Sequence, residues 1–332
     1  MENPENKNIT KVSVEKKMDR RTFCTSCAGC AAGLILFTYP GVLSRALASA
    51  VPDDKTKSKF SKKEIRKIFM QKGSCAHLFF YLLNNEYGHN KNDEERAIDQ
   101  LAGGIAERGY QCGMLWGTSM GASAEAYRIN NDADQAITSA VYTTKQVIED
   151  FTEITGSPDC IDITNIDFSK RFSKLKMIFS AGDCFELAHK WYLKAFKTTD
   201  TCLSRKDSCE KNITTCASEV IRKMGGNEEQ MVMVSGFAGG LGLSGNGCGA
   251  LSAAIWMKTL DWCRKDPERV GYSYSGVQNI MTIFEEATRG EMLCHKITGK
   301  KFISVDDHSE FVKNGGCEKL INLLAETKTS VS

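Results

Sequence analysis

What the sequence lacks already narrows the class of protein. Segments in which polar and apolar residues alternate are scarce across the 332 residues, and half-buried β-strands require such alternation. Neither sign of charge is in excess, because the formal net charge is only +2. With 42% hydrophobic and 25% charged residues, the composition excludes a disordered chain, a collagen-like fibre and a multi-span membrane protein. The sequence thus predicts an all-α globular protein.

Familiar catalytic and cofactor motifs are also missing. There is no Walker loop, no H-E-x-x-H segment, no Ser-His-Asp order and no paired-carboxylate pattern. No c-type haem is expected, because Cys294-His295 has Glu291 where the second thioether cysteine of a C-x-x-C-H segment would stand. After residue 48 no C-x-x-C pair occurs, which disfavours a thioredoxin-like dithiol and a zinc knuckle. Whether the protein is an enzyme stays open.

The first 48 residues are typical of an export signal. A polar stretch leads into Arg20-Arg21, an apolar run of small residues covers 28–43, and an Ala-x-Ala cleavage site ends at Ala48. The paired arginines resemble those of twin-arginine signals. The apolar run contains Pro40 and is too short to span a bilayer well. We therefore predict that residues 1–48 are cleaved, that the mature protein is periplasmic, and that it has no stable membrane span.

Cleavage would leave a nearly neutral chain with 36 basic and 37 acidic residues. Nothing in it has the character of a phosphate-binding surface, so nucleic acid is not an expected partner. Of the 14 cysteines, Cys24, Cys27 and Cys30 would leave with the signal, where they are typical of small apolar filler. Eleven cysteines then remain, and a chain this long does not need them as disulfide staples for its core.

Eight of the remaining cysteines form two matched sets. Cys75, Cys112, Cys160 and Cys184 (the first quartet) pair in order with Cys216, Cys248, Cys294 and Cys317 (the second quartet), at offsets of 141, 136, 134 and 133 residues. The surrounding sequence agrees, since Ala-Gly-Gly stands at both 102–104 and 238–240. Such self-similarity indicates a duplicated unit, which we place at residues 60–197 and 216–325 with a polar linker at 198–215.

The pattern resembles the C-GCAxxG-C-C family of redox-active proteins, in two tandem copies within residues 70–320. The first copy reads Cys-Gly-Met-Leu-Trp-Gly at 112–117, with Met for Ala, and the second reads Cys-Gly-Ala-Leu-Ser-Ala at 248–253, with Ala for the final Gly. The non-haem part of split-Soret cytochrome c is similar to this family. The resemblance implies an electron-transfer protein with a non-haem iron–sulfur site.

Helical signals fill both copies, and tandem helical copies predict two homologous halves packed as a pseudo-dimer. Apolar residues repeat at helical spacing after Ser74, a typical N-cap, and Gly88 is a typical stop. The predicted helices are 74–87, 92–106, 112–127, 133–154, 217–224, 227–240, 248–263 and 275–288.

A glycine-rich segment at 236–247 leads directly into Cys248. Glycine lets backbone N–H groups turn towards a bound group, and the N-terminus of the following helix carries partial positive charge. Both effects favour a thiolate or an anionic metal–sulfur cluster at Cys248. The first copy has fewer glycines, so the second site is the stronger prediction if only one site is functional.

The two quartets are compatible with iron–sulfur clusters, which need cysteine ligands in this number, or with structural disulfides, which are common in exported proteins. The twin-arginine route is used by proteins that fold before they cross the membrane. Its use would favour a cluster that is inserted in the cytoplasm before export. We therefore predict an exported redox protein whose eight quartet cysteines bind iron–sulfur centres and which exchanges electrons with a redox partner protein. The alternative is a disulfide-stabilised helical binding protein without a cofactor. The cluster type stays open.

Other cysteines and the histidines fall outside this scheme. A bridge between Cys202 and Cys209 is expected in the linker, and Cys263 is expected to be a buried thiol. His295 follows Cys294 and is either a surface residue or a support for that ligand. The sequence assigns no role to the remaining histidines, which are His77, His89, His189 and His308.

Overall fold

A computed structural model describes residues 59–168, 170, 173–205 and 211–327 of the chain. The predicted export signal at 1–48 and Cys209 lie outside the described residues, so cleavage, the export route and the Cys202–Cys209 bridge stay predictions. Within the described ranges every regular element is a helix, apart from isolated bridges that join Gln111 to Asp159 and Gly247 to Leu293. The predicted all-α fold is confirmed.

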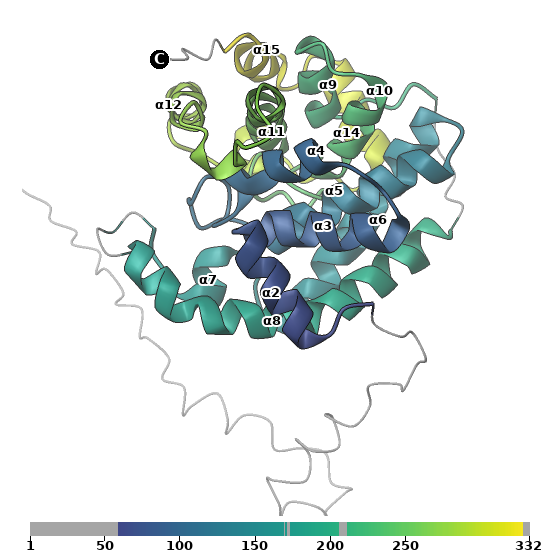
Figure 1. Ribbon diagram of the computed structural model, residues 1–332. Helices are drawn as coiled ribbons and strands as arrows, with labels where there is room; N and C mark the ends of the chain where they lie inside the picture. The colour runs from purple at the N-terminus through teal and green to yellow at the C-terminus, as the bar shows by residue number, and fades with distance from the viewer. Residues whose placement is uncertain (1–58, 169, 171–172, 206–210, 328–332) are drawn as a thin grey trace, which may run out of the picture. The chain divides into compact units, whose positions relative to one another are not determined.

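The first copy supplies the helices in the lower part of Figure 1 and also α4 (Asn92–Ala97), which lies higher, next to α11 (Gly249–Arg264). Its helices are α2 (Lys62–Lys72), α3 (Cys75–Tyr87), α4 with the 3₁₀ turn η2 (Ile98–Leu101), α5 (Gly113–Ile129), α6 (Ala133–Thr155), α7 (Cys160–Thr164) and α8 (Ser173–Leu203). As predicted, Ser74 caps α3 by accepting a hydrogen bond from the His77 N–H, and Gly88 ends it in the left-handed conformation.

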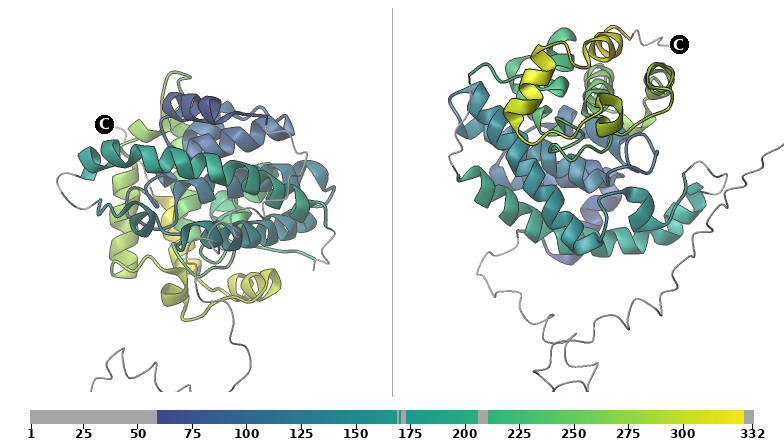
Figure 2. Two further views of the ribbon diagram at one scale, coloured as in Figure 1. Left: turned by 90° about the horizontal axis from the view of Figure 1, so that it is seen from below. Right: turned by 180° about the vertical axis from the view of Figure 1, so that it is seen from behind.

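The second copy repeats this order with shorter helices. It consists of α9 (Cys216–Lys223), α10 (Glu228–Met233) with η3 (Ser235–Phe237), α11 (Gly249–Arg264), η4 (Gly271–Ser273), α12 (Val277–Thr288), α13 (Cys294–Thr298), α14 (Val305–Lys313) and α15 (Glu318–Glu326). The view from behind in Figure 2 has these helices above and α8 along the base. The long α8 has no counterpart of its length here, because α14 and α15 fill the corresponding part of the sequence.

Three predicted boundaries differ from the structure by three residues or more. The helices predicted at 92–106 and 227–240 end at Leu101 and Phe237, because the chain there enters a left-handed turn described below. The linker predicted at 198–215 is helical up to Leu203, since α8 continues through it. Burial explains this extension: α8 packs along α6, and Thr199 on that face is fully buried although its residue type looks like linker.

The two copies share one hydrophobic core through reciprocal helix contacts. Helix α4 of the first copy packs on α11 of the second, and α10 of the second copy packs on α5 of the first. Trp116 of α5 meets Phe237 of η3 edge to face across this boundary, with ring centroids 4.8 Å apart and both rings fully buried. Because α4 and α10 hold equivalent places in the repeat, as do α5 and α11, these two contacts are equivalent to each other.

Polar contacts also join the copies. The Gln111 side chain donates to the Gly240 carbonyl at 3.0 Å and accepts from the Gly247 N–H at 3.1 Å. The Arg96 guanidinium donates to the carbonyl of Pro267 at 2.7 Å. The amide nitrogen and oxygen of Gln111 and the guanidinium of Arg96 thus each bond to the backbone of the other copy, as is expected where two units pack together permanently.

Among the described residues, no helix is both long enough and apolar enough to cross a lipid bilayer.

Candidate functional site

The first quartet comes from four separate helices and lines one cavity. Cys75 is the first residue of α3, Cys112 is the N-cap of α5, Cys160 is the first residue of α7, and Cys184 lies within α8. All four face a cavity of about 310 Å³ whose remaining walls are largely apolar, including Phe69, Met114 and Phe185. The structure thus brings together four residues that are more than 100 positions apart at the extremes.

The second quartet is arranged in the same way around a much smaller space. Cys216 begins α9, Cys248 caps α11, Cys294 begins α13, and Cys317 is the N-cap of α15. These four cysteines line a cavity of only about 10 Å³, closed by side chains such as Phe302 and Phe311. A volume of that size holds at most about one water molecule.

The thiols of each quartet are buried closely enough to affect one another. The Cys112 thiol donates a hydrogen bond to Cys75, which lowers the pKa of Cys75 and raises that of Cys112. Burial, followed by repulsion from the thiolate form of Cys75, raises the pKa of Cys184 to about 12. All eight quartet cysteines are free thiols in the structure.

The thiols of the second quartet also have pKa values shifted by burial and by one another. Burial, followed by the charge of Cys216 as thiolate, raises the pKa of Cys248 and of Cys317 to about 12. A buried group of thiols with such pKa values holds its protons at neutral pH unless a cation compensates the negative charge of the sulfurs.

A left-handed turn precedes the central cysteine in both copies. Residues 103–107 and 239–243 each form an unbroken run with positive φ, and the run includes non-glycine residues such as Ile105 and Leu241. Each such residue costs on the order of 1–2 kcal/mol, so the surroundings must impose this conformation. The turn directs the N–H of Gly103 towards the Cys75 sulfur and the N–H of Gly239 towards the Cys216 sulfur.

This placement refines the prediction about the glycine-rich segment. The segment was expected to serve Cys248, the cysteine that follows it. Its Gly239 N–H instead faces Cys216, whereas Cys248 receives N–H groups from the first turn of α11, at Ala250 and Leu251. The first copy reaches the same backbone conformation with fewer glycines.

The glycine after each central cysteine is required by close packing. A Cβ atom on Gly113 would lie 2.5 Å from the Sγ atom of Cys75, and one on Gly249 would lie 1.9 Å from the Phe237 carbonyl oxygen. Gly117, the last glycine of the motif, lets α5 approach α3, since a Cβ there would lie 2.2 Å from the Ala76 carbonyl oxygen. The second copy tolerates Ala253 at this position, fully buried in α11.

Neither quartet has the geometry of a single-ion site. In the part of the chain that the structure describes, no three side chains from His, Cys, Asp and Glu converge closely enough to hold one metal ion. Four thiolates around one zinc ion would lie about 3.8 Å apart, from a Zn–S distance of about 2.3 Å in a tetrahedron. The thiols of the first quartet surround a space of about 310 Å³, whereas the space between those of the second is nearly filled.

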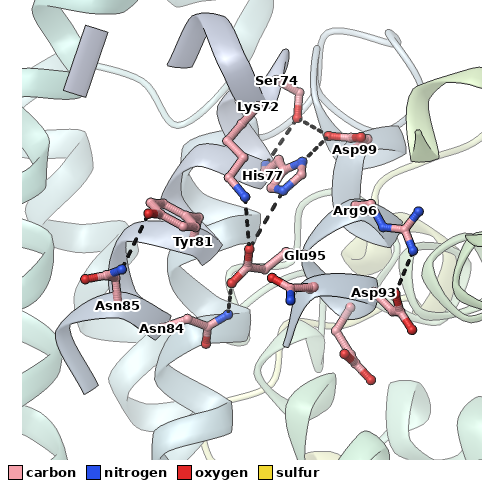
Figure 3. A network of polar contacts seen from close by, with 12 residues as sticks. Lys72, Ser74, His77, Tyr81, Asn84, Asn85, Asp93, Glu95, Arg96 and Asp99 are labelled. Atoms are coloured by element: carbon pink, nitrogen blue, oxygen red, sulfur yellow. Dashed lines mark hydrogen bonds and ion pairs between the residues drawn. The ribbon is translucent and has the colours of Figure 1, made fainter. Parts of the chain in front are cut away.

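A buried polar network lies beside the first quartet (Figure 3). Ser74, which also lines the cavity, donates to Asp99 at 2.7 Å, and the His77 ring lies between Asp99 at 3.3 Å and Glu95 at 3.8 Å. Asn84 donates to Glu95 at 2.8 Å. The corresponding second-copy residues are Thr215, Ser218, Met231 and Ser235, so this network belongs to the first copy alone. The sequence prediction missed it because His77 has no partner in the repeat.

The second cavity has a histidine that the sequence prediction also missed. His308 of α14 lines the cavity with the four thiols, is 2% exposed, and leaves its Nδ1 atom buried without a hydrogen-bond partner. Burial lowers the pKa of His308 to about 4, so the ring is neutral at pH 7. The other histidine nearby, His295, is half-buried and has its Nδ1 atom 2.7 Å from the Gly245 carbonyl oxygen.

The additional cysteines lie away from both cavities. Cys263 is fully buried in α11, as predicted, and its carbonyl accepts from Arg96 at the boundary between the copies. Cys202 lines a separate cavity with residues of α6.

Comparison with known proteins agrees with this duplicated cysteine arrangement. The model of the family described as "Putative redox-active protein (C_GCAxxG_C_C)" matches the chain twice, over residues 74–218 and 208–330. The chain belongs to this family, and it contains two tandem copies of the family's domain. No curated protein and no solved structure matches the chain significantly.

Proposed function

We propose that the protein is an electron-transfer protein in which each quartet holds one iron–sulfur cluster. The observation that carries the proposal is that eight cysteines far apart in sequence line two equivalent cavities, four thiols to each. Four cysteine ligands are what the common iron–sulfur clusters require. When bound, such a cluster supplies a one-electron redox couple.

The donor sets fit a cluster better than a single ion. The thiols of the first quartet surround a space without converging on a point, and the ligands of a cluster are divided among its iron atoms. Gly113 keeps the room beside Cys75 free, since any Cβ there would fill it. In the second cavity the Nδ1 atom of His308 is a buried polar group without a hydrogen-bond partner in the part of the chain that the structure describes. A cluster there would displace side chains that now fill the space, such as the half-buried Phe311.

The protein's own residues would stabilise the negative charge of thiolates and sulfide. Backbone N–H groups at Gly103 and Ala76 face Cys75, and those at Gly239 and Ala217 face Cys216. The N-termini of α3, α5 and α11 add partial positive charge at their cysteines. The apolar walls exclude water, which strengthens each of these interactions.

The proposal also covers the arrangement of the two copies, the location of the protein and its partner. We propose that its two copies form a pseudo-dimer, supported by the equivalent α4–α11 and α10–α5 contacts. We also propose export to the periplasm by the twin-arginine route and exchange of electrons with a redox partner protein, on the strength of the signal-like residues 1–48.

The alternative is a disulfide-stabilised helical binding protein, and one contact favours it. The thiols of Cys75 and Cys112 are in hydrogen-bond contact, so a two-electron oxidant could join them with loss of two protons.

Visible absorption, iron and acid-labile sulfide, measured on anaerobically purified protein, distinguish the two. Coloured protein with iron and sulfide in equal amounts, enough for two clusters, is the expected result. A colourless, iron-free protein with few titratable thiols would rule out the clusters and favour the alternative.

A further inference from the structure

The second cavity contains a buried imidazole whose Nδ1 atom has no hydrogen-bond partner among the described residues. Buried polar atoms are almost always hydrogen-bonded, and an unsatisfied one costs about as much as the hydrogen bond it lacks. His308 is 2% exposed and its Nδ1 atom has no partner, while its ring is held edge-on to Phe302 at a centroid distance of 4.7 Å. Phe302 therefore fixes the orientation of the ring, while the Nδ1 atom makes no hydrogen bond with any described residue.

The ring's only polar neighbours in the cavity lining are the thiols and Thr298. The lining is otherwise apolar, with Ile297, Phe302, Phe311 and Val312, and the Thr298 hydroxyl already donates to the Cys294 carbonyl at 2.8 Å. A neutral imidazole with an Nδ1–H group is a donor, and sulfur in a thiolate or sulfide is an acceptor. A group held by the second quartet would thus provide the missing partner.

On the basis of the proposed function, we infer that His308 donates an Nδ1–H hydrogen bond to a sulfur of the cluster held by the second quartet, and thereby raises its reduction potential above that of the first. A hydrogen bond to sulfur stabilises the reduced state, which carries more negative charge. No cysteine ligand needs to be replaced for this role, because the quartet already supplies four.

Charged residues near the first quartet also favour a lower reduction potential for the first centre than for the second. Glu107 lines the first cavity, and Asp159 and Asp183 directly precede Cys160 and Cys184 in the chain. Their counterparts in the second copy, by the same offsets, are Leu243, Leu293 and Gly316. Negative charges around the first centre favour its oxidised state, and the second centre lacks charges at these three positions, with Glu318 as the one carboxylate that directly follows a cysteine of its quartet. Electrons are then expected to pass from the first centre to the second.

The test is a redox titration of the full chain in its cluster-loaded form, followed by electron paramagnetic resonance. Cys112→Ser, which removes the first centre, assigns each wave to its quartet. In His308→Ala the ratio of reduced to oxidised second centre at a fixed potential should fall about tenfold, while the first centre is unchanged. His308→Asn should restore part of the shift, because its amide nitrogen lies near the place of Nδ1. His295→Ala is the matched control and should shift neither wave.

A second readout does not depend on any variant. In protein labelled with ¹⁵N-histidine, the reduced second centre should show weak nitrogen hyperfine coupling, typical of a hydrogen bond rather than of direct ligation. Strong coupling, an unshifted second wave in His308→Ala, an equal shift in His295→Ala, or a first centre with the higher potential would each overturn the inference. Protein without iron and sulfide would instead overturn the proposed function, so the two failures are distinguishable.

Discussion

The two cavities are lined by matching cysteine quartets, of which three members begin or cap corresponding helices, yet the cavities differ in much of what surrounds them. The first is an open space of about 310 Å³ beside a buried network of Ser74, His77, Glu95 and Asp99. The second is closed to about 10 Å³, apolar, and contacted by His308. Duplication has thus kept the cysteines and the left-handed turn, while the surroundings of the two quartets have diverged. Under the proposed function, two centres that differ in this way would be suited to a directed transfer of electrons.

Removal of one central cysteine should give the largest effect and should separate the two centres. Cys112→Ser should remove the iron of the first copy and Cys248→Ser that of the second, which is about half of the total in each case. The altered quartet then keeps only three thiol ligands. Iron and sulfide analysis of both variants checks this. Cys263→Ser changes a buried thiol outside both cavities and should leave the iron content intact; equal losses in all three variants would contradict the assignment of the quartets.

The Cys-Gly pair offers a smaller test in the first copy. Gly113→Ala places a methyl group 2.5 Å from the Sγ atom of Cys75, so we expect loss of stability by about 1–3 kcal/mol and weaker binding of the first centre. Urea unfolding and iron content measure the two effects. Gly182→Ala in α8 is the control, since a Cβ there meets nothing within 4 Å. A Gly113→Ala variant as stable and as iron-rich as this control would show that the close approach is not required.

The buried polar network beside the first cavity should give the smallest effect, a difference in stability between corresponding variants of the two copies. Ser74 and Thr215 are equivalent N-caps, and either change to alanine should cost about 1 kcal/mol for the lost cap. Ser74→Ala should cost roughly 1 kcal/mol more, because it also removes the hydrogen bond to the buried Asp99 carboxylate, whereas Thr215 donates to the neutral Ser218 hydroxyl. Denaturant unfolding of both variants compares them. Equal losses would mean that Asp99 finds another partner.

Much of this molecule could be predicted from local sequence. The helix at 74–87 follows from Ser74, the apolar spacing and Gly88, all of which act within a few residues. The spacing of the eight cysteines was enough to define two equivalent sets, because duplication leaves a periodic record in the sequence. The left-handed turn was harder to predict, since Ile105 and Leu241 adopt positive φ against their own preference and only tertiary contacts enforce this.

The residues around the sites could not be predicted in the same way. His77 and His308 have no counterpart in the other copy, so the comparison of repeats that singled out the cysteines passed over them. Their importance comes from burial and from neighbours on distant helices. The extension of α8 through Thr199 has the same cause, because its packing on α6 outweighs a polar local sequence.

The sequence by itself determined the all-α class, the duplication and the eight cysteines, because helix signals and repeats are properties of neighbouring or evenly spaced residues. Only the tertiary structure decided that each quartet lines a cavity, that one cavity is about 310 Å³ and the other nearly filled, and that a buried imidazole lines the second. These features depend on which side chains meet across separate helices, and such contacts leave no local pattern in the chain.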